Sequence, residues 1–146
     1  MKARKPLTGT AILLAGLVTL WAANVARSEE RRVDAAKLPP ASTKADVTYA
    51  KDIKPIFDNS CTGCHGEKRV KAKLRLDSLE HIRAGSKHGA VVTPGKIETS
   101  VLLRNIANLP GDEDDWMPPK DNKAKIAPLT KAEVGLVRAW IEQGAK

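Results

Sequence analysis

The sequence predicts an all-α protein with one folded domain of about four helices. Apolar residues recur at spacings of three and four in several segments, whereas the period-two alternation that is typical of β-strands is scarce. Residues that cap helices stand at the starts of these segments. A chain of 146 residues has room for one domain of ordinary size.

The first expected helix covers residues 48–59, with an apolar face made of Tyr49, Ile53, Ile56 and Phe57. Pro55 is awkward inside this helix, because a proline removes one internal hydrogen bond. We therefore expect a kink in the first turns or a helix that starts near Asp52.

Three further helices are expected. Residues 77–85 form a short helix that Asp77 caps. Ser100 is expected to cap the next helix, and the apolar stripe of that helix consists of Leu102, Leu103, Ile106 and Leu109. The last helix begins with a capping box of Thr130 and Glu133, and its stripe consists of Val134, Val137, Trp140 and Ile141.

Residues 1–28 have the layout of a secretory signal peptide. Three of the first five residues are basic, an apolar core follows over residues 11–23, and small residues suited to a signal peptidase come next. An uncleaved anchor is the alternative, because the charge-free residues 7–26 are just long enough to cross a bilayer. In both cases we expect a periplasmic or otherwise exported protein, membrane-bound only if this segment is retained.

Residues 29–46 are mixed in charge, contain paired prolines and show no sustained apolar period. This composition predicts a flexible linker. The folded domain is then expected over residues 47–146.

The composition argues against nucleic acid as a partner. The net charge is +8, but four of the 25 basic residues lie within residues 1–28. Aromatic residues make up only 3% of the chain, too few for stacking bases. A small domain with so few large side chains usually needs a disulfide, a metal or a bound cofactor to complete its core.

The residues Cys61-Thr62-Gly63-Cys64-His65 form the pattern C-x-x-C-H, which is typical of covalent attachment of c-type haem. Two thiols on one short turn can each form a thioether to a haem side chain, and the adjacent imidazole can bind the iron. A covalent haem would also supply the buried apolar content that the side chains lack.

Three other interpretations of the two cysteines stay open. They could form a disulfide or a dithiol redox pair, although the βαβ context of a thioredoxin-like motif is missing. They could bind zinc with His81 and His88, although the gaps lie slightly outside common finger spacings. They could also be inert, which would leave His65 without a role.

Met117 is the expected second axial ligand of the iron, because it is the only methionine after the initiator and cytochromes c commonly use Met or His there. Two prolines follow it and stiffen its loop. His81, expected to be solvated on a helix, and His88, in a glycine-containing loop, are weaker candidates. Trp116 is expected to pack over the haem edge.

Two charged runs lie near these residues, a basic one over residues 68–75 and an acidic one over residues 112–115. Such runs are usually solvated surface. The alternative is a docking rim that steers a charged redox partner towards the haem edge.

Seven short segments carry a resemblance to a known family: residues 52–57, 61–66, 74–78, 91–95, 100–104, 117–119 and 139–141. Over about residues 49–144 the chain resembles the planctomycete-type cytochrome c domain family, a branch of the single-haem, mostly helical cytochromes. The resemblance implies a class I cytochrome c-like bundle of about four helices wrapped around one covalent haem, with the first helix packed across the last.

The resemblance also implies thioethers at Cys61 and Cys64 and iron ligation by His65 and Met117. We therefore expect an exported, monomeric, single-haem c-type cytochrome that carries one electron at a time between redox proteins and is not an enzyme. The alternative is a haem enzyme or small-ligand sensor with a labile sixth ligand, and a zinc or dithiol module is a third possibility.

Overall fold

The computed structural model of the protein describes residues 32–109 and 113–146. The signal peptide or anchor expected at residues 1–28 lies outside the described residues. Val33–Lys146 form one unit of the chain. None of the described helices combines the length and the apolar character that a membrane crossing needs.

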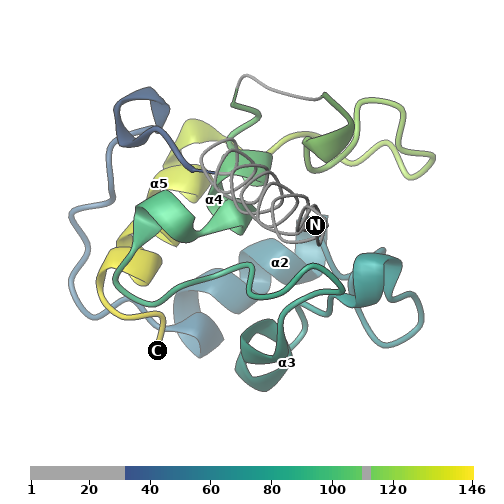
Figure 1. Ribbon diagram of the computed structural model, residues 1–146, viewed down its shortest axis with the longest axis horizontal. Helices are drawn as coiled ribbons and strands as arrows, with labels where there is room; N and C mark the ends of the chain where they lie inside the picture. The colour runs from purple at the N-terminus through teal and green to yellow at the C-terminus, as the bar shows by residue number, and fades with distance from the viewer. Residues whose placement is uncertain (1–31, 110–112) are drawn as a thin grey trace, which may run out of the picture. The chain divides into compact units, whose positions relative to one another are not determined.

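Over the described residues, the fold consists of four α-helices, joined by loops and short helical turns, with no strand beyond two isolated bridges. This confirms the expected all-α class with about four helices (Figure 1). In chain order the elements are η1 (Ala35–Lys37), η2 (Tyr49–Ile53), α2 (Lys54–Ser60), η3 (Lys71–Lys73), α3 (Leu79–Ala84), η4 (Ile97–Thr99), α4 (Val101–Ile106), η5 (Glu113–Asp115) and α5 (Lys131–Glu142).

The first expected helix is divided at Ile53. A wide π-type turn, η2, covers its first part, and the regular helix α2 starts at Lys54. Pro55 then lies in the first turn of α2, where its missing N–H would have no intrahelical partner in any case. The expected disturbance by this proline is therefore confirmed.

Two of the expected caps act differently from the prediction. Ser78, not Asp77, caps α3, because its hydroxyl oxygen accepts the His81 N–H at 3.1 Å. Ser100 precedes α4, but its hydroxyl donates to the Lys96 carbonyl at 2.8 Å and so closes the preceding loop. Ser78 thus satisfies an N–H group in the first turn of α3, whereas Ser100 satisfies backbone groups of the loop before α4.

The predicted capping box of α5 is confirmed. Thr130 Oγ1 accepts the Glu133 N–H at 3.2 Å, and the Glu133 carboxylate accepts the Thr130 N–H at 2.7 Å. The four predicted stripe residues of this helix are all buried: Val134, Val137, Trp140 and Ile141.

The core is centred on the packing of α5 against η2. Trp140, Phe57 and Ile53 are fully buried, and the Tyr49 ring lies 6.2 Å from the Trp140 ring and 6.4 Å from the Phe57 ring. Tyr49 donates its hydroxyl to the Leu76 carbonyl at 2.9 Å, and burial raises its pKa to about 12. The first and last helical segments therefore share one core, which positions the turn that follows α2.

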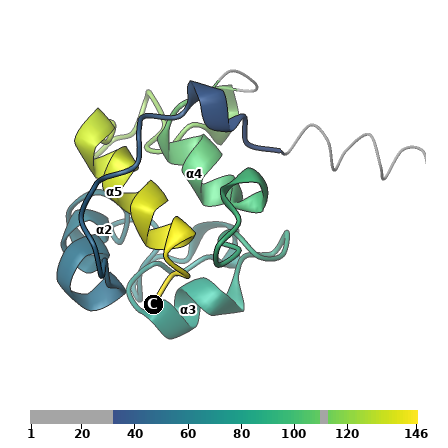
Figure 2. The same cartoon turned by 90° about the vertical axis from the view of Figure 1, so that its left-hand side faces the viewer.

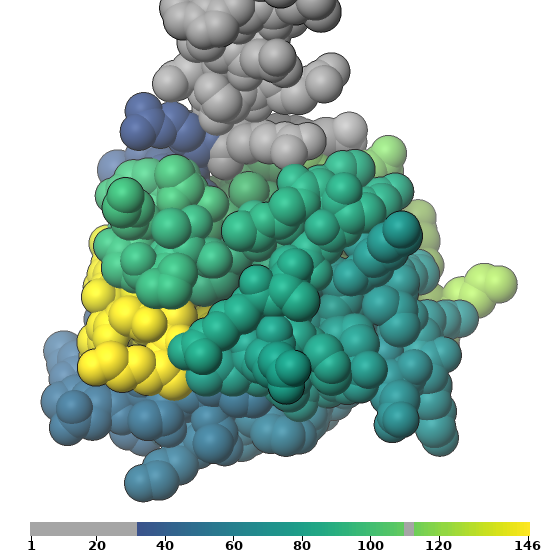
Figure 3. Space-filling view, turned by 60° about the horizontal axis from the view of Figure 1, so that its bottom comes forward, coloured from purple at the N-terminus to yellow at the C-terminus, as the bar shows by residue number. Residues whose placement is uncertain are grey.

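The C-terminal residues close this core. The Lys146 carbonyl accepts the Tyr49 N–H at 2.7 Å and the Trp140 indole N–H at 2.9 Å. Figure 3 shows the yellow C-terminal residues between the blue segment of η2 and α2 and the green segment that precedes α4.

The segment expected to be a flexible linker, residues 29–46, packs on the folded unit where it is described. Figure 2 shows this dark blue segment running along α5, and Val33 and Leu38 are buried. The Ser42 N–H donates to the Gly135 carbonyl at 2.9 Å. An extended segment buries isolated side chains rather than a periodic face, which is why the sequence pattern did not reveal this packing.

Candidate functional site

The motif Cys61–His65 follows α2 directly and forms a tight turn. The N–H groups of Cys64 and His65 both donate to the Cys61 carbonyl, at 3.0 and 2.9 Å, while the Cys61 N–H donates to the Phe57 carbonyl at 2.8 Å. A Cβ at Gly66 would lie 2.5 Å from the Thr62 carbonyl oxygen, so only glycine fits the end of this turn. The turn holds both thiols and the imidazole close together.

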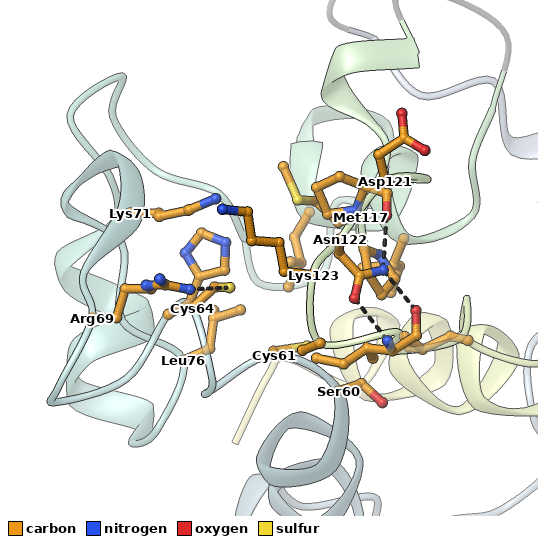
Figure 4. A pocket seen from close by; sticks show the side chains of 18 residues that line it. Ser60, Cys61, Cys64, Arg69, Lys71, Leu76, Met117, Asp121, Asn122 and Lys123 are labelled. Atoms are coloured by element: carbon orange, nitrogen blue, oxygen red, sulfur yellow. Dashed lines mark hydrogen bonds between the residues drawn. The ribbon is translucent and has the colours of Figure 1, made fainter.

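A cavity of about 350 Å³ opens beside this turn, within the range of roughly 300–1,000 Å³ that cofactor and ligand pockets occupy. Cys61, Cys64 and His65 line it together with Met117. Figure 4 shows Cys61, Cys64 and Met117 around the same space. Other apolar side chains of the wall include Leu76, Leu102, Ile106, Ile126 and Leu129.

His65 is a buried imidazole on this wall. Its Nδ1 atom is buried and makes no hydrogen bond to the described residues. Burial lowers its pKa, and the nearby backbone of Leu74 and Lys71 acts more weakly in the opposite direction. The ring is therefore neutral at pH 7 and has a lone pair available for a metal ion, so this residue fits a haem ligand.

Both cysteine sulfurs are free thiols, so the structure does not join them in a disulfide. Burial, and next the neighbouring Cys64, raise the pKa of the Cys61 thiol to about 12. An Arg69 Nη1 lies 3.7 Å from the Cys64 sulfur. Two unbridged thiols beside a cofactor-sized cavity fit the two thioethers of a c-type haem.

Met117 reaches the cavity from the chain that follows η5. Its N–H donates to the Asn105 carbonyl, at the end of α4, at 3.0 Å. Its side chain is half-buried, and Pro118 and Pro119 line the cavity beside it. The structure thus brings all four predicted site residues to one cavity: Cys61, Cys64, His65 and Met117.

The rival histidines do not reach this cavity. The Nδ1 atom of His81, on α3, lies 2.8 Å from the Asp77 carboxylate, and His88 is exposed in a loop. Among residues 32–109 and 113–146, no three His, Cys, Asp or Glu side chains are placed to hold a metal ion, so the proposed zinc ligands are not assembled. Trp116 does not line the cavity, and its indole N–H donates instead to the Leu109 carbonyl at 3.0 Å.

The loop over residues 120–129 also contributes to the cavity, which the sequence pattern did not predict. Asn122, Lys123, Ile126 and Leu129 from this loop line the cavity. The available signal was the position of Asn122 three residues after Pro119, a combination typical of turns. In Figure 4, Lys71 and Lys123 point toward one another, so basic side chains from the run over residues 68–75 and from this loop border the cavity.

Comparison with known proteins supports this picture. A protein-family model described as Planctomycete cytochrome C matches residues 61–121, which include both the C-x-x-C-H turn and Met117. No curated protein and no solved structure matches the chain significantly. Cytochrome c domains carry haem c and generally transfer electrons. This match supports a planctomycete-type cytochrome c domain at residues 61–121.

Proposed function

We propose that this protein is an exported single-haem c-type cytochrome that carries one electron at a time between redox proteins. The observation that carries the proposal is the single cavity into which Cys61, Cys64 and His65 open on one wall and Met117 on another. A c-type haem needs all four side chains at once, because two thiols form the thioethers and an imidazole and a methionine sulfur bind the iron.

Each of the four side chains has a defined role in this proposal. The S–H groups of Cys61 and Cys64 would add across the two vinyl groups of a haem, so that each sulfur gains a carbon and its hydrogen goes to the other vinyl carbon. His65 and Met117 would hold the iron. The haem supplies an iron that gains and loses one electron, at a potential that a methionine ligand raises.

The rest of the cavity favours a carrier over an enzyme. His65 and Met117 together would leave no free position on the iron for a substrate. The apolar wall, which includes Leu102, Ile106 and Leu129, excludes water from the bound group. In the proposed class I-like arrangement, the helices and the Met117 loop wrap around the haem as part of the core.

The proposal also includes export of the protein and its docking to a redox partner. The pattern of residues 1–28 supports export by a signal peptide, or retention as an anchor, ahead of the folded unit. The basic run over residues 68–75 includes Arg69 and Lys71 at the cavity, which supports docking of an acidic redox partner there. A monomer is the proposed state.

Visible absorption spectra test this function. The protein should be made with a working cytochrome c maturation system and measured before and after dithionite, then after carbon monoxide. We expect sharp bands in the reduced form and no change with carbon monoxide, because the iron has two protein ligands. Absence of haem bands would overturn the proposal, whereas ready carbon monoxide binding by the unmodified protein would favour the ligand-sensor alternative.

A further inference from the structure

Asn122 joins the two arms of the loop that begins with Met117. Its side-chain Nδ2 donates to the backbone carbonyls of Pro119 and Ile126, both at 2.9 Å. Its Oδ1 accepts the Ile126 N–H at 2.7 Å. The amide therefore uses both of its ends to close the loop.

Few other hydrogen bonds hold this loop. Over residues 118–129, the backbone hydrogen bonds among described residues are two local ones, from the Asn122 N–H to the Pro119 carbonyl and from the Lys125 N–H to the Asn122 carbonyl. Both involve Asn122 itself. On the near side, the Met117 N–H is fixed to the Asn105 carbonyl of α4. Among the residues that the structure describes, the hydrogen bonds of the far arm are thus made by Asn122, through its side chain to Ile126 and through its carbonyl to Lys125.

The same loop forms a wall of the cavity. Its lining side chains include Met117, Ile126 and Leu129. Apolar contacts are non-directional and do not by themselves fix one position of a chain segment. Hydrogen bonds to two carbonyls and one N–H do fix a position, because each has a narrow range of distance and angle. Figure 4 shows the Asn122 amide and its hydrogen bonds beside Met117.

We propose that Asn122 is a positioning residue that keeps the Met117 sulfur at the iron by holding this loop closed. The inference rests on the proposed function, because it needs the haem and ligation by Met117. Without the Asn122 amide, the loop opens more often, Met117 leaves the iron, and an external ligand takes its place. The apparent affinity for that ligand rises with the fraction of molecules in which this loop is open.

The test compares two substitutions at Asn122 with a matched control. Asn122→Ala removes all three side-chain hydrogen bonds. Asn122→Asp keeps the size and the acceptor for the Ile126 N–H but loses both donors, so it preserves folding if Asn122→Ala does not. Gln143→Ala is the control, because Gln143 also bridges two backbone groups, the Val47 N–H at 2.9 Å and the Lys44 carbonyl at 2.8 Å, and does not line the cavity.

The measurements are carbon monoxide titration of the reduced protein and the near-infrared sulfur-to-iron band of the oxidised protein, after denaturing mass spectrometry has confirmed the attached haem. We expect both Asn122 variants to bind carbon monoxide at least about tenfold more tightly, which is about 1.4 kcal/mol, and to show a weaker band. Gln143→Ala should lower the melting temperature and change neither signal.

Two results would overturn the positioning role. The first is that the Asn122 variants match the parent in carbon monoxide affinity and in the near-infrared band. The second is that Gln143→Ala changes these two signals as much as the Asn122 variants do. The Met117→Ala variant separates this failure from a failure of the proposed function. If Met117→Ala behaves like the parent, or no haem is attached, the proposed function is wrong. If Met117→Ala opens the iron and the Asn122 variants do not, only the role of Asn122 is wrong.

Discussion

Single residues determine the chemistry of this site through burial. His65 is neutral at pH 7 because burial lowers its pKa, and burial also raises the pKa of the Cys61 thiol to about 12. Both groups are thus kept uncharged in an apolar surrounding. These are the protonation states that suit an iron ligand and a thiol awaiting a covalent bond.

Removal of the Met117 sulfur should open the iron. We expect Met117→Ala to keep the haem attached through Cys61 and Cys64, to lower the reduction potential, and to raise carbon monoxide affinity at least about tenfold. Leu129→Ala is the matched control, because Leu129 lines the same cavity without a ligand atom. A Met117→Ala spectrum and potential equal to those of the parent would show that the sixth ligand lies elsewhere.

Asp77 should make a pH-dependent contribution to stability. Hydrogen bonds from Arg75, and next from His81, lower its pKa to about 2, below the value of about 3.9 in an unfolded chain. The stabilisation is therefore complete above about pH 4 and is lost as the pH falls towards 2. The melting temperatures of the parent and of Asp77→Asn should differ at pH 6 and converge in this acid range, and a difference independent of pH would contradict the account.

At the scale of helices and segments, the sequence predicted the regular elements well and the irregular ones poorly. The stripe and capping box of α5 are as expected, because a helix has a fixed period and its caps are local. The packing of residues 33–46 and the wall formed by residues 120–129 were not predicted. Extended and looped segments make contacts with residues distant in sequence, and no local pattern encodes such contacts.

The packed N-terminal segment gives a sharp prediction at Gly135, in the middle of α5. A Cβ there would lie 2.5 Å from the Pro40 carbonyl oxygen. On a solvent-exposed helix face, Gly→Ala raises the free energy of unfolding by about 1 kcal/mol. A clash with a packed neighbour lowers it by typically about 1–3 kcal/mol. We therefore expect Gly135→Ala to lower the free energy of unfolding, measured by denaturant titration.

Gly63→Ala is the control for this prediction, because a Cβ at Gly63 would meet no atom within 4 Å. It should change the free energy of unfolding by less than about 0.5 kcal/mol. A Gly135→Ala variant more stable than the parent would show that residues 33–46 are held loosely against α5.

At the scale of the whole molecule, four residues separated by up to 56 positions in sequence meet at one cavity, from Cys61 to Met117. Their types were readable in the sequence, because C-x-x-C-H is local and Met117 is the only methionine after the initiator. That all four meet at one site was expected only from the haem chemistry and the family resemblance, because no local pattern encodes how the helices pack. The Met117 loop reaches the cavity through its bond to the Asn105 carbonyl of α4.

The basic border of the cavity should speed electron transfer to an anion. With ferricyanide as oxidant, we expect the double variant Arg69→Gln/Lys71→Gln to react several-fold more slowly than the parent at low salt, and the difference to shrink as salt rises. The double variant Lys51→Gln/Lys96→Gln removes the same net charge and is the control, because both lysines are exposed and neither lines the cavity. Equal rates for both variants, once corrected for net charge, would mean that the basic run is only solvated surface.

The central claim is that Cys61 and Cys64 hold one haem covalently, and denaturing mass spectrometry tests it most directly. The protein should be produced with a working cytochrome c maturation system and compared with the double variant Cys61→Ala/Cys64→Ala. The account predicts a polypeptide mass increased by one haem in the parent and no increase in the variant. A parent protein that carries no haem mass under these conditions would contradict it.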